Sequence, residues 1–105
     1  MRLVRTADFE AVYRSGVRRS SGQFVVFCRA TGGPQSRFGV SIKKALGNAV
    51  VRNRMRRRIR EILRQHSSEI PPGWDIVIHP RRSVERAGFA PLTAELVSLL
   101  RGLGK

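Results

Sequence analysis

The sequence predicts an α+β protein, an α/β sandwich with its elements in the order α-β-β-β-α-β-α. Short runs of β-branched and aromatic residues alternate with glycine and proline, which is typical of strands joined by turns. A longer segment, Ala49–Gln65, instead repeats its apolar residues at the helical period. Because the chain has 105 residues and is 41% hydrophobic, we expect one domain that spans residues 1–105.

The first half of the chain is expected to form a helix followed by three strands. A short amphipathic helix is predicted at Thr6–Ser15, with Thr6 as its N-cap. The strands are predicted at Val17–Ser20, residues 23–30 and residues 38–43. Glycines and a proline separate the last two strands, so these two are expected to form a β-hairpin.

The second half is expected to place a helix against the sheet and to add one more strand. The apolar face of Ala49–Gln65 consists of Val51, Met55, Ile59, Ile62 and Leu63. A buried strand at residues 74–79 ends at Pro80, and a last helix begins near Pro91. Residues 81–87 between them are expected to be an exposed loop.

The net charge of +14 indicates a polyanionic partner, and nucleic acid is the first candidate. No stretch approaches 18 consecutive apolar residues, and Asp8 and Glu10 stand where a targeting peptide avoids acids, so no membrane association is expected. The single cysteine, Cys28, cannot form an intramolecular disulfide and lies in an apolar run. A buried, reduced thiol and a cytoplasmic location follow as expectations.

The positive charge is concentrated on one predicted helix and the segment before it. Nine basic residues lie between Lys43 and Arg64, and Glu61 is the only acid among them. A solvated helix face usually mixes charges to gain pairs at i,i+4, whereas this one places like charges there. A localisation tag is the other simple alternative, but a tag need not be part of an amphipathic helix. The pattern favours a surface that binds phosphates, without distinguishing RNA from DNA.

No constellation for protein catalysis is evident. His66 and His79 are isolated in the sequence, the acidic residues form no cluster, and Cys28 has no evident activating partner. We therefore expect neither a catalytic residue nor a protein metal site.

The segment RFGVSIKKALGNAVVRNRMRRRIREILR, residues 37–64, resembles the hallmark region of the bacterial ribonuclease P protein. Its central pieces are Lys43-Lys44, Gly47-Asn48-Ala49-Val50, Arg52-Asn53-Arg54 and Arg60-Glu61. The family also has an early helix with two aromatic residues four apart, here Phe9 and Tyr13.

The resemblance implies a fold and a division of labour. The fold is that of the second domain of a small-subunit ribosomal protein, with the arginine helix in a left-handed βαβ crossover. Physical rules alone favour the right-handed connection. A catalytic RNA, the ribonuclease P RNA, holds Mg²⁺ and hydrolyses the phosphodiester, while the protein binds that RNA and the 5′ leader of precursor tRNA. One RNA and one protein form the complex.

The resemblance also assigns site residues. The leader-binding set is Phe9, Tyr13, Val25, Phe27, Arg52, Asn53 and Arg57. The set that binds the catalytic RNA is Lys43, Lys44, Arg54, Arg56, Arg58 and Arg60. Strand alternation places Val25 and Phe27 on one sheet face, which predicts a cleft shared with Phe9 and Tyr13. Ordinary core packing is the alternative for the two helix aromatics.

Two other functions remain open at this point. A ribosomal protein or general RNA-binding module fits the composition, but not the spacing of the hallmark pieces. An autonomous RNA-cleaving enzyme would need an acid–base constellation, which the sequence does not show.

Overall fold

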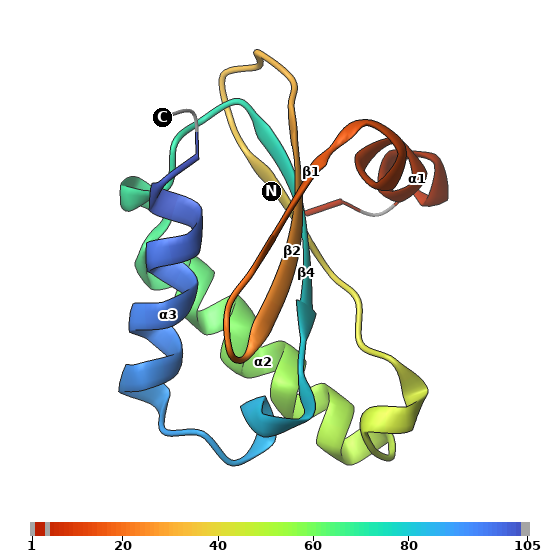
Figure 1. The fold of residues 1–105 in the computed structure, drawn as a ribbon, viewed down its shortest axis with the longest axis vertical. Helices are drawn as coiled ribbons and strands as arrows, with labels where there is room; N and C mark the ends of the chain where they lie inside the picture. Colours follow the sequence, from red (N-terminus) through yellow and green to blue (C-terminus); the bar gives the residue numbers. More distant parts are fainter. Residues whose placement is uncertain (1, 4, 104–105) are drawn as a thin grey trace.

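The computed structural model describes residues 2, 3 and 5–103 and contains the predicted order of elements (Figure 1). Its helices and strands are α1 (Thr6–Ser15), β1 (Val17–Ser20), β2 (Phe24–Ala30), β3 (Arg37–Val40), α2 (Ala49–Gln65), β4 (Trp74–Pro80) and α3 (Phe89–Arg101). Three short 3-10 turns lie between them, η1 (Lys44–Leu46), η2 (Ser67–Glu69) and η3 (Arg82–Glu85).

In the described part of the chain the strands form one four-stranded sheet in the order β1-β2-β4-β3. β2 pairs antiparallel with both β1 and β4, whereas β3 and β4 are parallel neighbours. Helix α2 connects these two parallel strands, so the βαβ crossover implied by the resemblance is present. Phe27 faces Val77 across β2 and β4, and Gly39 faces Val77 across β3 and β4. These three residues therefore share one face of the sheet.

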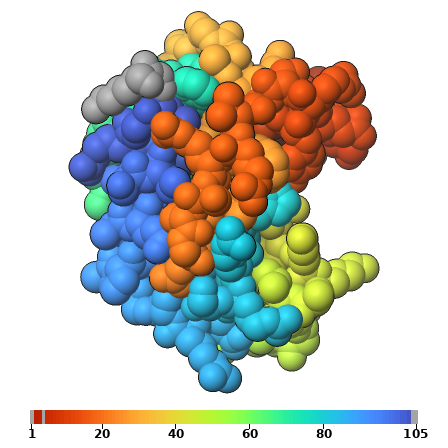
Figure 2. Space-filling model, in the orientation of Figure 1, coloured from red at the N-terminus to blue at the C-terminus, as the bar shows by residue number. Residues whose placement is uncertain are grey.

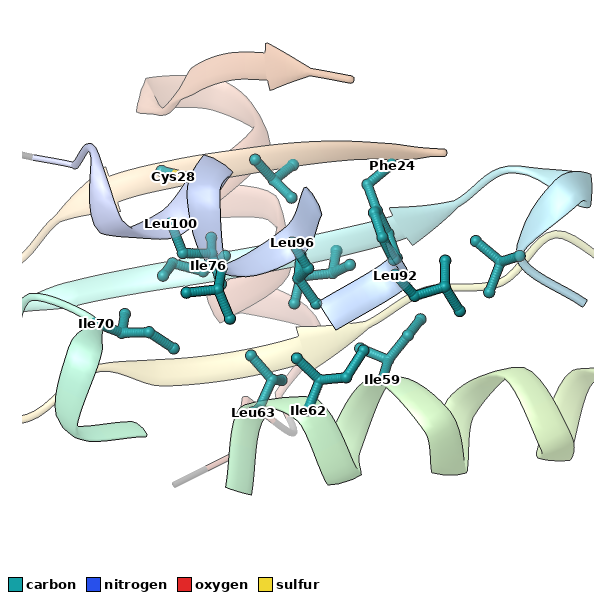
Figure 3. Close-up of a cluster of buried hydrophobic side chains, with 14 of the residues drawn as sticks. Phe24, Cys28, Ile59, Ile62, Leu63, Ile70, Ile76, Leu92, Leu96 and Leu100 are labelled. Atoms are coloured by element: carbon teal, nitrogen blue, oxygen red, sulfur yellow. The ribbon is translucent and has the colours of Figure 1, made fainter. Parts of the chain in front are cut away.

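The main core lies on the opposite face, under α2 and α3 (Figure 3). Alternate residues of β2 and β4 point into it, and each helix contributes residues three or four apart. Fully buried members include Phe24, Val26, Ile76, Ile78, Met55, Ile59, Leu92, Leu96 and Leu100. Burial of such a side chain stabilises the fold by about 1.5–3 kcal/mol. Cys28 is buried here as a free thiol, as expected.

Helix α1 covers the other face of the sheet, on the side away from α2 and α3 (Figure 1). Its Val12 is buried in a second cluster with Leu3 and Val77, against which Phe9 and Phe27 pack. A Cβ atom at Gly39 would lie 2.5 Å from Phe9 Cζ, so the absent side chain lets the Phe9 ring rest directly on β3.

Four expectations about local structure were wrong. The predicted β-hairpin does not form, because β2 and β3 both pair with β4 and not with each other. Arg5, not Thr6, is the N-cap of α1, and its side chain makes no capping hydrogen bond. β3 ends at Val40 rather than at residue 43, because the chain turns there towards η1 and α2. Residues 81–87 are not simply an exposed loop, since they contain η3, whose Val84 is fully buried.

None of the described helices combines the length and apolar character needed to cross a membrane.

Candidate RNA-binding site

A cleft of about 510 Å³ opens on the sheet face that carries α1. Its apolar lining comes from Val25 and Phe27 of β2 and from Leu46 of η1. His79 of β4 faces Val25 in the adjacent strand and completes this floor. Figure 2 shows the surface hollowed between α1, in orange-red, and the yellow segment that leads into α2.

Three rings form a cluster at this floor. The Tyr13 ring of α1 meets Phe27 edge-on, with 5.1 Å between the ring centroids. His79 lies 5.5 Å from Phe27 and 5.7 Å from Tyr13 by the same measure. The Tyr13 hydroxyl is 2.8 Å from His79 Nε2, within hydrogen-bond distance. Because Tyr13 remains 42% exposed, the cluster presents aromatic surface to solvent.

Both polar members of this cluster are uncharged at neutral pH. Burial lowers the pKa of His79 from its ordinary value of 6.5, and the nearby Lys43 charge lowers the pKa further. Burial also raises the pKa of Tyr13, although the Ser41 side chain opposes that shift. Neutral His79 therefore has one ring nitrogen that donates and one that accepts.

The rim of the cleft is basic. Four cationic side chains line it, namely Arg18, Lys43, Arg81 and Arg82, and no carboxylate is among the described lining residues. Arg82 is held in place by a hydrogen bond of 3.0 Å from its Nη2 to the carbonyl of Ala45. An apolar aromatic floor with a cationic rim suits single-stranded RNA, whose bases stack while its phosphates need counter-charge.

Phe9 lies elsewhere, in a second cleft of about 620 Å³ at the β3 side of the molecule. This cleft has an apolar floor that includes Leu3 and Phe38, and Arg60 and Arg64 of α2 at its edge. Burial lowers the pKa of Arg60, and so do the charges of Arg2 and Arg56. The structure thus brings Tyr13, Val25 and Phe27 together, but it does not bring Phe9 to the same cleft.

The remaining residues of the two predicted sets are spread along η1 and α2. Lys44, Arg54 and Arg57 are exposed, while Asn53 accepts a hydrogen bond of 3.2 Å from Arg56. Arg52, Asn53 and Arg57 are not among the described residues that line the cleft of Val25 and Phe27. Lys43, which was predicted to meet the catalytic RNA, lines that cleft.

Arg58 points into the protein rather than away from it. Its Nη1 donates to the carbonyl of Val84 at 2.8 Å and to that of Glu85 at 3.2 Å, and its Nη2 donates to the carbonyl of Ala87. These bonds attach α2 to the segment around η3. A guanidinium used in this way has fewer donors left for an RNA phosphate.

The comparison with known proteins decides the family. The family model described as "Ribonuclease P" matches residues 1–104. The chain belongs to the ribonuclease P protein family. A relative named "Ribonuclease P protein component" from Geobacillus thermodenitrificans is 36% identical over 104 residues, which cover 98% of this chain and 86% of the relative. One from Brevibacillus brevis is 37% identical over 101 residues, covering 95% and 80%.

Solved ribonuclease P proteins have the same fold. The protein from Thermotoga maritima superposes with a TM-score of 0.92 at 34% identity, over 100% of this chain and 99% of that one. The protein from Staphylococcus aureus gives 0.84 at 33% identity, over 95% and 92%. As a ribonuclease P protein, the chain is a component of a ribonucleoprotein endoribonuclease of tRNA processing and has an RNA partner.

Sequence reasoning missed several residues of this ribonuclease P protein's cleft. His79 was interpreted as isolated, but β4 places it opposite Val25 and beside Tyr13. The alternation of β2 and β4 could have found it only if the pairing of these strands had been known. Arg18, Arg81 and Arg82 were also missed, because nothing local to these arginines distinguishes them from other surface cations.

Proposed function

We propose that this ribonuclease P protein binds the catalytic RNA subunit and the 5′ leader of precursor tRNA, and so promotes removal of the leader. The main support for this proposal is the cleft in which Phe27, Tyr13 and His79 form an aromatic floor beneath a cationic rim. A single strand can place a base on that floor and its phosphates against Lys43 and Arg81. Stacking of this kind contributes about 1–3 kcal/mol per base.

In this proposal the catalytic RNA meets exposed and half-buried cations of η1 and α2. Lys44, Arg54, Arg56 and Arg60 are the candidates, and Arg52, Asn53 and Arg57 stay assigned to the leader. Support comes from the charge of α2, where eight of the 17 helix residues are exposed and four of these eight are arginines, namely Arg54, Arg57, Arg60 and Arg64. A duplex RNA surface presents phosphates that such a helix can contact without reading bases.

Hydrolysis in this proposal is performed by the RNA with Mg²⁺. The described residues include no group of three or more histidine, cysteine, aspartate or glutamate side chains that could hold a metal ion. The ion's ligands are therefore taken to come mainly from the RNA, whose phosphate oxygens suit Mg²⁺. We also propose a complex of one RNA and one protein, located in the cytoplasm.

The test is cleavage of a precursor tRNA by a bacterial ribonuclease P RNA at low magnesium concentration, with and without the purified protein, and with the protein alone. Stimulation that requires both components supports the proposal. Cleavage by the protein alone would overturn the division of labour. If several types of ribonuclease P RNA show no stimulation, the general RNA-binding alternative is favoured.

The leader assignment needs a separate measurement. Binding of precursor tRNA and of mature tRNA to the assembled holoenzyme is compared in a calcium buffer, which slows cleavage. Phe27→Ala is expected to weaken the precursor complex by roughly tenfold and to leave mature tRNA nearly unaffected, because only the precursor has a base to stack. Equal losses on both RNAs would contradict the assignment.

A further inference from the structure

The second cleft, of about 620 Å³, lies at the β3 edge of the sheet and shares no described lining residue with the proposed leader cleft. Its floor is apolar and includes Phe38 and Val40 of β3 and Leu63 of α2. Leu63 is buried, whereas the two β3 residues are half-buried and pack against the main core. Ligand clefts usually measure about 300–1,000 Å³, so this one has room for a nucleotide.

The same cleft is lined by three guanidinium groups, those of Arg2, Arg60 and Arg64. No carboxylate is among the described lining residues. Arg64 is paired with Glu61, but Arg60 is surrounded by like charge. Burial lowers the pKa of Arg60, and the charges of Arg2 and Arg56 lower it further. The cleft therefore concentrates positive charge that an anionic ligand would stabilise.

An apolar floor beside guanidinium groups matches the two halves of a nucleotide. The base is a flat ring whose faces stack on aromatic and apolar side chains, while the phosphate accepts paired N–H donors from arginine. A guanidinium also stacks against a flat ring. Contact with a duplex backbone needs only the cations, because the bases of a duplex are already stacked on one another. The cleft thus fits an unpaired nucleotide better than a paired one.

The position of the cleft favours the RNA subunit as the source of this nucleotide. Arg60 and Arg64 continue the row of exposed arginines that begins at Arg54 and Arg57 of α2. Spacings of three and four residues place all four on one side of the helix. We propose that an unpaired nucleotide of the ribonuclease P RNA inserts its base into this cleft and places its phosphate against Arg60 and Arg2. This inference rests on the proposed binding of the RNA subunit to α2 and deepens it.

An inserted base would give the complex a selectivity that phosphate contacts lack. Phosphates are alike along every RNA helix and carry no sequence information. A cleft that accepts one unpaired base is filled only by an RNA that presents such a base at the right distance from the helix bound to α2. The inserted nucleotide therefore distinguishes the RNA subunit from other structured RNAs.

The experiment probes the RNA subunit bound to the protein without precursor tRNA, so that no leader is present. Acylation of the RNA 2′-hydroxyl groups, read by primer extension, reports which nucleotides lose mobility. Wild-type protein is expected to protect one unpaired nucleotide of the RNA subunit. Binding affinity is measured on the same complexes across a salt series, and circular dichroism confirms that each variant is folded.

A variant that fills the cleft tests whether this nucleotide occupies it. Ser67 is exposed and lines the cleft, so Ser67→Trp fills the cleft without removing a cation. It is expected to lose the protection, to weaken binding of the RNA subunit by roughly tenfold and to keep the wild-type salt dependence. Ser68→Trp is the matched control, because Ser68 is exposed but is not among the described lining residues. It is expected to behave as wild type.

Two further changes separate the phosphate from the base. Arg60→Ala is expected to lose the same protection and, unlike Ser67→Trp, to reduce the slope of log affinity against log salt by about 0.7–0.9. An abasic site at the protected nucleotide is expected to weaken binding of wild type by roughly tenfold and to have no further effect on Ser67→Trp, in which the base already cannot enter. Additive losses would overturn the insertion.

The outcomes separate the two proposals. If wild type does not bind the RNA subunit, the proposed RNA binding itself fails. If wild type binds but no unpaired nucleotide depends on Ser67 and Arg60, the contact with α2 stands and the inserted nucleotide is rejected. Protection that appears only on the leader of added precursor tRNA would also reject it, because the cleft would then belong to the leader. Protection lost in Ser67→Trp and Arg60→Ala, and kept in Ser68→Trp, establishes the insertion.

Discussion

The guanidinium of Arg37 binds the buried carboxylate of Asp75 through two hydrogen bonds, from Nε at 2.9 Å and from Nη2 at 2.7 Å. Asp75 is only 2% exposed, and Arg37 Nη1 also lies 3.5 Å from the carboxylate of Asp8 in α1. The hydrogen bond with Asp75 raises the pKa of Arg37. The Arg37 side chain thus joins β3, β4 and α1 near the proposed leader cleft.

Arg37→Ala is expected to destabilise the protein by about 3–5 kcal/mol, because it leaves the Asp75 charge buried without a partner. Urea denaturation followed by circular dichroism measures the change. Asp8→Ala is the matched control, since it removes only the longer and more exposed contact and should cost less than about 1 kcal/mol. Similar losses in the two variants would contradict the importance of the buried pair.

Arg54 and Arg58 are expected to differ although both belong to the arginine-rich helix. Arg54→Ala removes an exposed cation, so it should weaken binding to the RNA subunit and reduce the slope of log affinity against log salt by about 0.7–0.9. Arg58→Ala removes three hydrogen bonds to backbone carbonyls and should lower stability by about 2–3 kcal/mol. Filter binding across a salt series, together with thermal unfolding, separates a phosphate contact from an internal one.

Stability should depend on pH through His79. Burial holds the pKa of this side chain below 6.5, so the unfolded chain binds more protons than the folded chain once the pH falls below about 6.5. The stabilisation of the fold by neutral His79 is therefore complete above pH 6.5 and is lost as the pH falls through the lowered pKa. The unfolding free energy of wild type should drop more than that of His79→Phe between about pH 7.5 and about pH 5.5. Parallel curves would show that His79 is not responsible.

Cys28 should be unreactive while the protein is folded. Burial raises the pKa of its thiol to about 11, although the Arg19 charge opposes the shift, and the reactive thiolate is scarce near pH 8. Alkylation by iodoacetamide, followed by mass spectrometry, is expected to be slow in buffer and fast in denaturing urea. Fast labelling of the folded protein would mean that β2 opens readily beneath α3.

Local signals predicted the helices well. The bounds of α1 and α2 are those predicted, because apolar periodicity is a property of the segment itself. The start of α2 is also determined locally, since the Asn48 side chain accepts a hydrogen bond of 3.0 Å from the backbone N–H of Val51. The free, buried state of Cys28 was predicted for the same reason, from its place in an apolar strand.

Non-local contacts account for what was missed. His79 lines the cleft with Val25 and Phe27 because β4 pairs with β2, a pairing between residues that are far apart in the sequence. Residues 81–87 looked like a solvent-exposed loop because they are rich in arginine, but Arg58 of α2 binds their carbonyl oxygens. Phe9 has the spacing of a cleft residue, yet Gly39 on a distant strand determines where its ring lies. The local sequence pattern around a residue does not reveal which distant residues it contacts in the fold.

The acidic side chains are largely occupied inside the molecule, and this affects how the protein behaves before assembly. Arg37 holds Asp8 and Asp75, Arg64 holds Glu61, Arg101 and His66 hold Glu69, and Glu95 accepts from the backbone of Gln23. Because these carboxylates are already paired within the protein, they do little to neutralise the arginines and lysines that face the solvent. The free protein should therefore bind any accessible RNA non-specifically. Dissociation from these other RNAs would then limit the rate at which it assembles with its RNA subunit.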